Sequence, residues 1–198
     1  MSEATEILLV SGSLRGGSTN TALLRTAATL SIPGIATTLY DAMGELPHFN
    51  PDDDVPGERL DPAVRDLRAQ LARSDAVLFS TPEYAGALPG SFKNLLDWTV
   101  GGGETYGMPV AWINTAGPAA PSGGGDAEAS LRKVLGYTGS EIVECGELGR
   151  IPVPREAIGD DGLLADPVIR ESLARALRTL ADAVADGEAE RQRVSSSG

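Results

Sequence analysis

The residues best suited to chemistry lie in a loop near the start of the chain, which reads Ser11-Gly-Ser-Leu-Arg-Gly-Gly-Ser-Thr-Asn20. An apolar run precedes this loop and a helical pattern follows it. Free backbone N–H groups and the positive end of the helix dipole would therefore converge on one point. Arg15 adds a positive charge, and the neutral side-chain donors are Ser13, Ser18, Thr19 and Asn20. The pattern predicts a cradle for a phosphate group, because an ordinary helix cap does not need so many consecutive small or polar residues.

Three familiar phosphate loops do not fit this stretch. The dinucleotide fingerprint needs a second glycine where the chain has Leu14, and the nucleotide P-loop needs a lysine between Gly17 and Ser18. A phosphatase loop of the Cys-x5-Arg type fails because Cys145 and Arg150 are one residue too close. What remains is a monophosphate held without metal or lysine, as flavodoxin-type folds hold FMN.

Two later loops complete a candidate site. Thr81–Gly90 contains two prolines, and in it Tyr84 could cover a flat ring while the backbone faces the polar rim of that ring. The other loop is Asn114–Gly125. Of 28 acidic residues, none lies between Ile7 and Tyr40 and none between Thr105 and Gly125. A bound anion would account for these two acid-free windows.

Apolar runs alternate with amphipathic segments along the chain. Strands are expected at 7–10, 35–40, 76–80, 110–114 and 141–145, and helices at 19–30, 61–71, 89–99, 126–137 and from 166. Such alternation predicts an α/β fold with a parallel sheet covered by helices on both faces. Ligands of such sheets bind beyond the carboxyl ends of the strands, where the three loops lie. We expect one domain over residues 1–185, an irregular loop at 41–57 and a disordered tail at 186–198.

Composition narrows the classes of function. With 198 residues, 41% of them apolar, the chain can form a full core, and a net charge of −12 argues against a nucleic-acid partner. One cysteine and one histidine leave little room for a disulfide, a zinc site or a histidine-based triad. The chain has no basic leader and no apolar run that could span a bilayer, so we expect a cytoplasmic protein without a membrane partner.

The motifs also resemble a known family. Gly-Ser-Leu-Arg-x-x-Ser-x-Asn after the first strand is similar to the NADPH-dependent FMN reductases, which include chromate, quinone and azobenzene reductases. Thr81-Pro-Glu-Tyr84, the run from Pro89 to Asn94, and Asp97-Trp98 fit the same family. The likeness covers roughly residues 6–145, and the sequence departs from the pattern after Trp98.

This resemblance implies a flavodoxin-like three-layer sandwich with a five-stranded parallel sheet and FMN as cofactor. Hydride would pass from NADPH or NADH through FMN to a small acceptor such as a quinone, flavin, azo compound or chromate. No catalytic side chain is implied, because the cofactor carries the chemistry. Many relatives are homodimers or homotetramers. The residues implied to bind FMN are Ser13, Arg15, Ser18, Thr19, Asn20, Pro82, Glu83, Tyr84, Ala85, Thr115, Ala116 and Gly117.

Alternatives remain open from the sequence. The chain could be a flavodoxin-like electron carrier that never meets NAD(P)H, or a hydrolase or transferase that holds a phosphate ester in the same cradle. Asp52-Asp53-Asp54 could recruit a divalent ion, although a solvated acidic turn is the plainer interpretation. His48 could lie near the flavin rim or simply at the surface. The sequence separates neither NADPH from NADH nor one acceptor from another.

Overall fold

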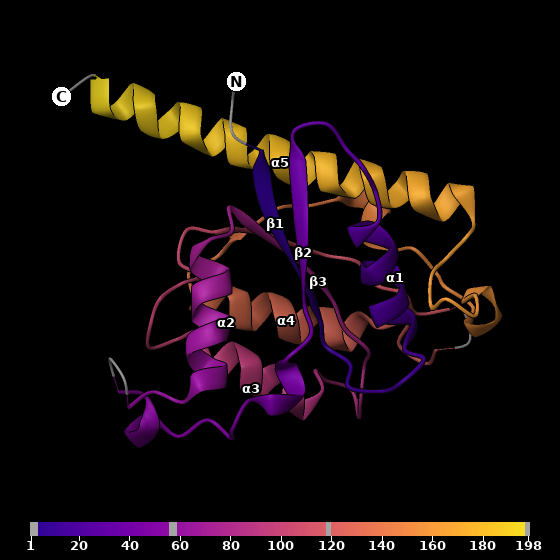
Figure 1. Ribbon diagram of the computed structural model, residues 1–198, viewed down its shortest axis with the longest axis horizontal. Helices are drawn as coiled ribbons and strands as arrows, with labels where there is room; N and C mark the ends of the chain where they lie inside the picture. Colours follow the sequence, from indigo (N-terminus) through magenta and orange to yellow (C-terminus); the bar gives the residue numbers. More distant parts are fainter. Residues whose placement is uncertain (1–3, 56–58, 118–119, 197–198) are drawn as a thin grey trace.

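The computed structural model describes residues 4–55, 59–117 and 120–196. Five parallel strands form one sheet in the order β2-β1-β3-β4-β5, with helices packed on both sides (Figure 1). The strands are β1 (Thr5–Ser11), β2 (Ile35–Tyr40), β3 (Ala76–Ser80), β4 (Pro109–Trp112) and β5 (Glu141–Ile142). This strand order and these layers confirm the predicted flavodoxin-like three-layer sandwich.

The two faces of the sheet bury separate apolar clusters. Successive strand side chains point to opposite faces, so Ile7 and Leu9 join one cluster while Leu8 and Val10 join the other. The first cluster is closed by α1 (Thr19–Ala28) and α5 (Pro167–Ser196). The second is closed by α2 (Pro62–Ala72), α3 (Gly90–Trp98) and α4 (Gly125–Tyr137). Because both faces are covered, β3 is apolar apart from Ser80 and wholly buried.

Helix starts follow the capping signals in the sequence. The Ser18 side chain accepts a hydrogen bond from the Thr21 N–H at the start of α1, and the Asp61 side chain does the same for the Ala63 N–H at the start of α2. Pro62 and Pro167 occupy the first helical positions of α2 and α5. These caps fix where each helix begins relative to the strand before it.

The last strand is shorter than predicted. We expected it to reach Cys145, but β5 ends at Ile142, and Cys145 instead precedes the short 3₁₀ helix η3 (Gly146–Gly149). Gly146 has a φ of +56°, which turns the chain out of the extended conformation. Pairing resumes beyond this turn, where a parallel bridge joins Asn114 to Arg150.

Helix α5 also continues beyond residue 185, the predicted end of the domain. Residues 186–196, which we expected to be a disordered tail, extend α5 to Ser196, and Figure 1 shows these last turns reaching past the sheet. The stretch contains no proline, and its glutamate, glutamine and arginine residues favour helix. The end of the predicted tail, at 197–198, lies outside the described residues.

The irregular segment after β2 is fastened to α3 by motif side chains. Asn94 accepts a hydrogen bond from the Phe49 N–H at 2.7 Å and donates one to the Pro47 carbonyl at 2.8 Å. The indole N–H of Trp98 donates to the same carbonyl at 2.9 Å, and its ring packs edge-on against Phe49. These contacts give the Asn94 and Trp98 of the motif a structural role. The end of the predicted 41–57 loop, at 56–57, lies outside the described residues.

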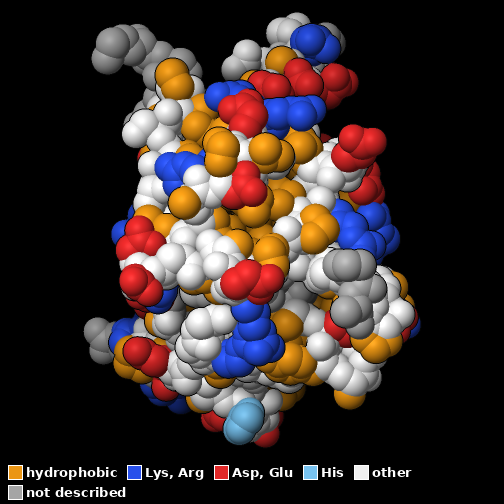
Figure 2. Space-filling model, turned by 90° about the vertical axis from the view of Figure 1, so that its right-hand side faces the viewer, with side chains coloured by type: hydrophobic (Ala, Val, Ile, Leu, Met, Phe, Trp, Pro, Cys, Tyr) orange, Lys and Arg blue, Asp and Glu red, His pale blue; other side chains and the backbone are white. Residues whose placement is uncertain are grey.

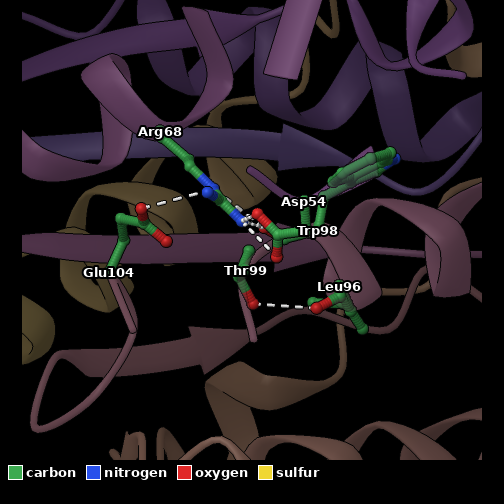
Figure 3. A network of polar contacts seen from close by, with 6 residues as sticks. All are labelled: Asp54, Arg68, Leu96, Trp98, Thr99 and Glu104. Carbon is green, nitrogen blue, oxygen red and sulfur yellow. Dashed lines mark hydrogen bonds and ion pairs between the residues drawn. The ribbon is translucent and has the colours of Figure 1, made fainter. Parts of the chain in front are cut away.

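A second polar network joins that segment to α2 and to the turn after α3 (Figure 3). The Arg68 guanidinium contacts Asp54 at 2.9 Å, Glu104 at 3.4 Å and the Trp98 carbonyl at 2.8 Å. Burial raises the pKa of Glu104 against the opposing effect of Arg68. Asp54 of the acidic run is thus an ion-pair partner of a partly buried arginine.

The other two acids of that run, Asp52 and Asp53, are exposed in a short 3₁₀ turn. On the face shown in Figure 2, acidic and basic side chains are interspersed among apolar ones, without an extended basic surface. In the part of the chain that the structure describes, no helix is long and apolar enough to cross a membrane.

Candidate functional site

Three loops meet at the carboxyl edge of the sheet and enclose a cavity of about 340 Å³. This volume lies within the range of small-molecule sites, roughly 300–1,000 Å³. The loops follow β1, β3 and β4, which are neighbours in the sheet. The lining residues are Ser13, Arg15, Ser18, Thr19, Asn20, Thr81, Pro82, Glu83, Tyr84, Asn114, Thr115, Ala116, Gly117, Ala120, Pro121, Gly124, Val153 and Arg155.

A buried chain of polar side chains ties the three loops together beneath this cavity. The Asn20 amide oxygen accepts hydrogen bonds from the Ser80 hydroxyl at 2.8 Å and the Thr115 hydroxyl at 3.1 Å. Thr19 continues the chain, since its hydroxyl lies 3.2 Å from that of Thr115. Because the amide oxygen of Asn20 is occupied twice, its NH₂ group is the part left to face a ligand.

The first loop presents a row of unused backbone donors. Within the described chain, the N–H groups of residues 16–20 donate to no protein acceptor. Three of them precede α1 and two belong to its first turn, where the helix dipole is positive. The Arg15 side chain is exposed and donates only to the Gly17 carbonyl of its own loop. Donors in this arrangement are suited to binding an anion.

The second loop forms a tight turn at the mouth of the cavity. Tyr84 and Ala87 exchange two backbone hydrogen bonds across Ala85 and Gly86, which have φ angles of +52° and +72°. Positive φ is unusual for alanine, so the turn holds Ala85 in a strained conformation. Tyr84 is half-exposed, which leaves one face of its ring free to cover a bound molecule.

Glu83 joins the second loop to the third. One carboxylate oxygen accepts from the Ser122 hydroxyl at 2.5 Å, and the other accepts from the N–H groups of Asp126 and Ala127 at 3.0 and 3.1 Å. The hydrogen bond from Ser122, helped by those from the start of α4, lowers the pKa of Glu83. The side chain thus caps α4 and is turned away from acid–base work.

This geometry predicts a pH-dependent effect of Glu83→Gln on stability. A carboxyl group with a lowered pKa stabilises the fold above its unfolded-state pKa, and that contribution is lost as pH falls through its folded-state pKa. The variant should therefore melt below the parent protein at pH 7, and the difference should shrink toward pH 3. Thermal melts from pH 3 to 8 measure this. The same substitution at the exposed Glu141 should show no such trend, and an equal trend in both variants would contradict the role of Glu83.

The charge balance of the lining favours an anion. Arg15 and Arg155 are its two cations among the described residues, and neither forms an ion pair there. Glu83 is the acid of the lining, and its carboxylate is engaged by three donors. A chain with net charge −12 therefore presents a positive pocket.

The structure brings together most of the predicted site residues. Eleven of the twelve line the cavity, and Ala85 lies at the tip of the adjacent turn instead. Thr81 and Asn114 lie at the ends of two predicted loops but were not named as binding residues, and Val153 and Arg155 were not predicted at all. Asn114 had a signal, because it is a polar residue directly after an apolar strand. No sequence signal marked Val153 and Arg155, since they reach the cavity only because residues 149–153 pair with Asn114 and Thr115 in the folded chain.

Two other residues considered from the sequence lie elsewhere. His48 is exposed and is not part of the cavity lining. Cys145 is half-buried just beyond β5, where burial raises the pKa of its thiol. Neither is placed to act as a nucleophile or base in this cavity.

Known proteins resemble this chain over most of its length. Residues 5–149 match the family described as NADPH-dependent FMN reductase. An NAD(P)H-dependent FMN reductase from Pseudomonas aeruginosa is 34% identical over 182 residues, covering 91% of this chain and 95% of the relative. An NADPH:quinone oxidoreductase from Arabidopsis thaliana is 31% identical, covering 88% and 89% of the two chains. A solved flavoenzyme, an NAD(P)H:(acceptor) oxidoreductase from Paracoccus denitrificans, superposes with a TM-score of 0.75 at 29% identity, covering 92% of this chain and 98% of that one.

Proposed function

The chain belongs to the NADPH-dependent FMN reductase family, and from that premise we propose which of its residues perform the reaction. It is an FMN-dependent NAD(P)H oxidoreductase. The observation that carries the assignment of residues is the row of free N–H groups at residues 16–20, of which Ser18, Thr19 and Asn20 line the same cavity as Tyr84. One end of that cavity suits a phosphate and the other a flat ring.

The residues present fit FMN. The first loop offers backbone donors, hydroxyl groups and Arg15 to a phosphate. The hydroxyls of Ser80 and Thr115 orient the Asn20 amide, which leaves its NH₂ group for the ligand. In the second loop, the N–H groups of Glu83, Ala85 and Gly86 donate to no acceptor in the described chain, so they are available to the polar edge of a flavin. Thr115, Ala116 and Gly117 would line the other edge.

FMN, when bound, supplies the transfer of hydride and electrons. The protein therefore has to bind the flavin, orient it and shield it from water. The buried chain from Asn20 to Thr115 fixes the spacing between the phosphate cradle and the ring edge. Glu83 holds the second and third loops together, and both loops would line the flavin ring. Backbone N–H groups of the second loop would stabilise negative charge that develops on the ring.

Flavin absorbance tests this assignment directly. Purified protein mixed with FMN under anaerobic conditions should bind the flavin, and NADPH should bleach it much faster than it bleaches free FMN. Bound flavin that stays oxidised with both NADPH and NADH would indicate an electron carrier instead. Flavin that does not bind would refute the cradle, and magnesium-dependent phosphatase activity without flavin would point to the hydrolase alternative.

Replacing Arg15 with alanine tests the phosphate end of the site. The guanidinium is the one cation of the cradle loop itself, so its loss should weaken FMN binding by about 1.5–3 kcal/mol, the value of a charge-assisted hydrogen bond. Fluorescence titration of apoprotein with FMN measures the dissociation constant. Arg25→Ala, on the exposed side of α1, is the matched control and should leave FMN affinity unchanged. An unchanged FMN constant in Arg15→Ala would remove Arg15 from the site.

We further propose a quinone as the acceptor class, in a cytoplasmic homodimer or homotetramer. The relatives named as quinone oxidoreductases support the acceptor. Large exposed apolar side chains at Val100, Tyr106 and Tyr137 support an interface between copies of this chain. Sedimentation velocity would give the oligomeric state, and a monomer at micromolar concentration would refute that part of the proposal.

A further inference from the structure

The segment after η3 brings a second arginine to the cavity from a part of the chain outside the family match, which ends at residue 149. That residue is Arg155, which lines the cavity and is exposed. No sequence motif marks it. Its position follows from how the preceding residues pair with the start of the loop beyond β4.

Backbone pairing fixes this segment firmly. The Asn114 N–H donates to the Gly149 carbonyl at 2.9 Å, the Ile151 N–H donates to the Asn114 carbonyl at 2.9 Å, and the Val153 N–H donates to the Thr115 carbonyl at 3.1 Å. Ile151 and Val153 are buried in the cluster that α1 and α5 cover. Two residues after Val153 the chain turns into the 3₁₀ helix η4 (Arg155–Ala157). Arg155 is therefore carried on an ordered support beside Thr115, which the buried polar chain links to Thr19 and Asn20.

The Arg155 guanidinium has no carboxylate partner among the described residues. The acid that shares its cavity, Glu83, is engaged by Ser122 and by the start of α4. Arginine keeps its charge at every physiological pH and binds phosphate through paired donors. An unpaired arginine at a ligand cavity is thus suited to a phosphate monoester.

We propose that Arg155 is a phosphate-binding residue of this cavity, contributed by a segment of the chain outside the cradle at residues 11–20. This inference rests on the proposed function, whose ligands carry phosphate monoesters in two places: the 5′-phosphate of FMN and the 2′-phosphate of NADPH. Either one presents the same dianionic chemistry to a guanidinium. If the 2′-phosphate is the partner, Arg155 gives the enzyme a preference for NADPH over NADH.

Paired ligands that differ in one phosphate test the proposal in Arg155→Gln. The first pair is FMN and riboflavin, titrated into apoprotein by flavin fluorescence. The second is adenosine 2′,5′-bisphosphate and 5′-AMP, titrated into FMN-loaded protein by calorimetry. We expect the variant to lose about tenfold in affinity for the phosphate-bearing member of one pair, with the other member unchanged. Loss confined to FMN identifies the 5′-phosphate, and loss confined to the bisphosphate identifies the 2′-phosphate.

Arg65→Gln is the matched control, because Arg65 is an exposed arginine of α2 outside the cavity, and the two variants have the same net charge. It should bind all four ligands as the parent protein does. Equal losses for both members of a pair, or no loss in either pair, would overturn the assignment of Arg155. Parent protein that binds neither FMN nor riboflavin would instead overturn the proposed function itself, so the two failures are distinguishable.

Discussion

Gly12→Ala should lower the melting temperature of the apoprotein by roughly 2–12 °C, which corresponds to about 1–3 kcal/mol for overpacking in a chain of this size. A Cβ at this buried position would lie 2.3 Å from the Thr81 hydroxyl oxygen, 2.6 Å from the Thr81 Cβ and 2.9 Å from Cγ of Phe92. The Phe92 ring is fully buried, so it has no room to move away from the added methyl group. The Gly12 N–H also donates to the Ser80 carbonyl at 2.8 Å, so the backbone cannot retreat without breaking that bond.

The same substitution should weaken FMN binding at least tenfold, about 1.4 kcal/mol, because Gly12 opens the cradle and Thr81 lines the cavity. Gly16→Ala is the matched control for stability, since a Cβ at Gly16 would meet nothing within 4 Å. Calorimetric melts of both apoproteins and FMN titrations of the Gly12 variant measure the two effects. Equal melting temperatures for the two variants would show that Gly12 does not need to be glycine.

The fold could be predicted because local pattern and tertiary structure agree over most of the chain. The strands at 35–40 and 76–80 occur with the expected bounds, since uninterrupted apolar or β-branched runs end there at polar turns. β5 was predicted too long, because the sequence at 141–145 does not reveal the turn into η3, where Gly146 takes a positive φ. α5 was predicted to end too early, because its last turns carry no apolar stripe to mark them as helix.

Residues of the cavity lining were predictable where they come from one contiguous stretch of sequence. The cradle at 11–20 is one such segment, and its composition alone indicates an anion. Glu83 was predicted to line the ring, but its contacts with Ser122 and α4 join loops about 40 residues apart, which no local pattern records. Arg155 depends on the pairing of 149–153 with Asn114 and Thr115, just beyond β4, so only the three-dimensional structure brings it to the cavity.

Asn20→Asp should abolish measurable FMN binding at micromolar protein, a loss of about a hundredfold or more. The Asn20 side chain is buried, and its oxygen already accepts from the Ser80 and Thr115 hydroxyls, so an aspartate can keep both bonds. What changes is the group facing the cavity, where an NH₂ donor becomes a carboxylate oxygen. Losing a donor to a charged group costs about 1.5–3 kcal/mol, and repulsion between the carboxylate and the phosphate adds to this loss.

The effect should be specific to the phosphate, because the size of the side chain and its buried hydrogen bonds are retained. Riboflavin, which lacks the phosphate, should bind the Asn20→Asp variant within a few-fold of its affinity for the parent protein. Asn50→Asp provides the control for net charge, since Asn50 is exposed in the segment after β2 and lies outside the cavity. Both variants carry a net charge of −13, one unit below the −12 of the parent chain. If the two variants bound FMN equally well, the buried amide would not face the phosphate, and the chain from Asn20 to Thr115 would serve only to join the loops.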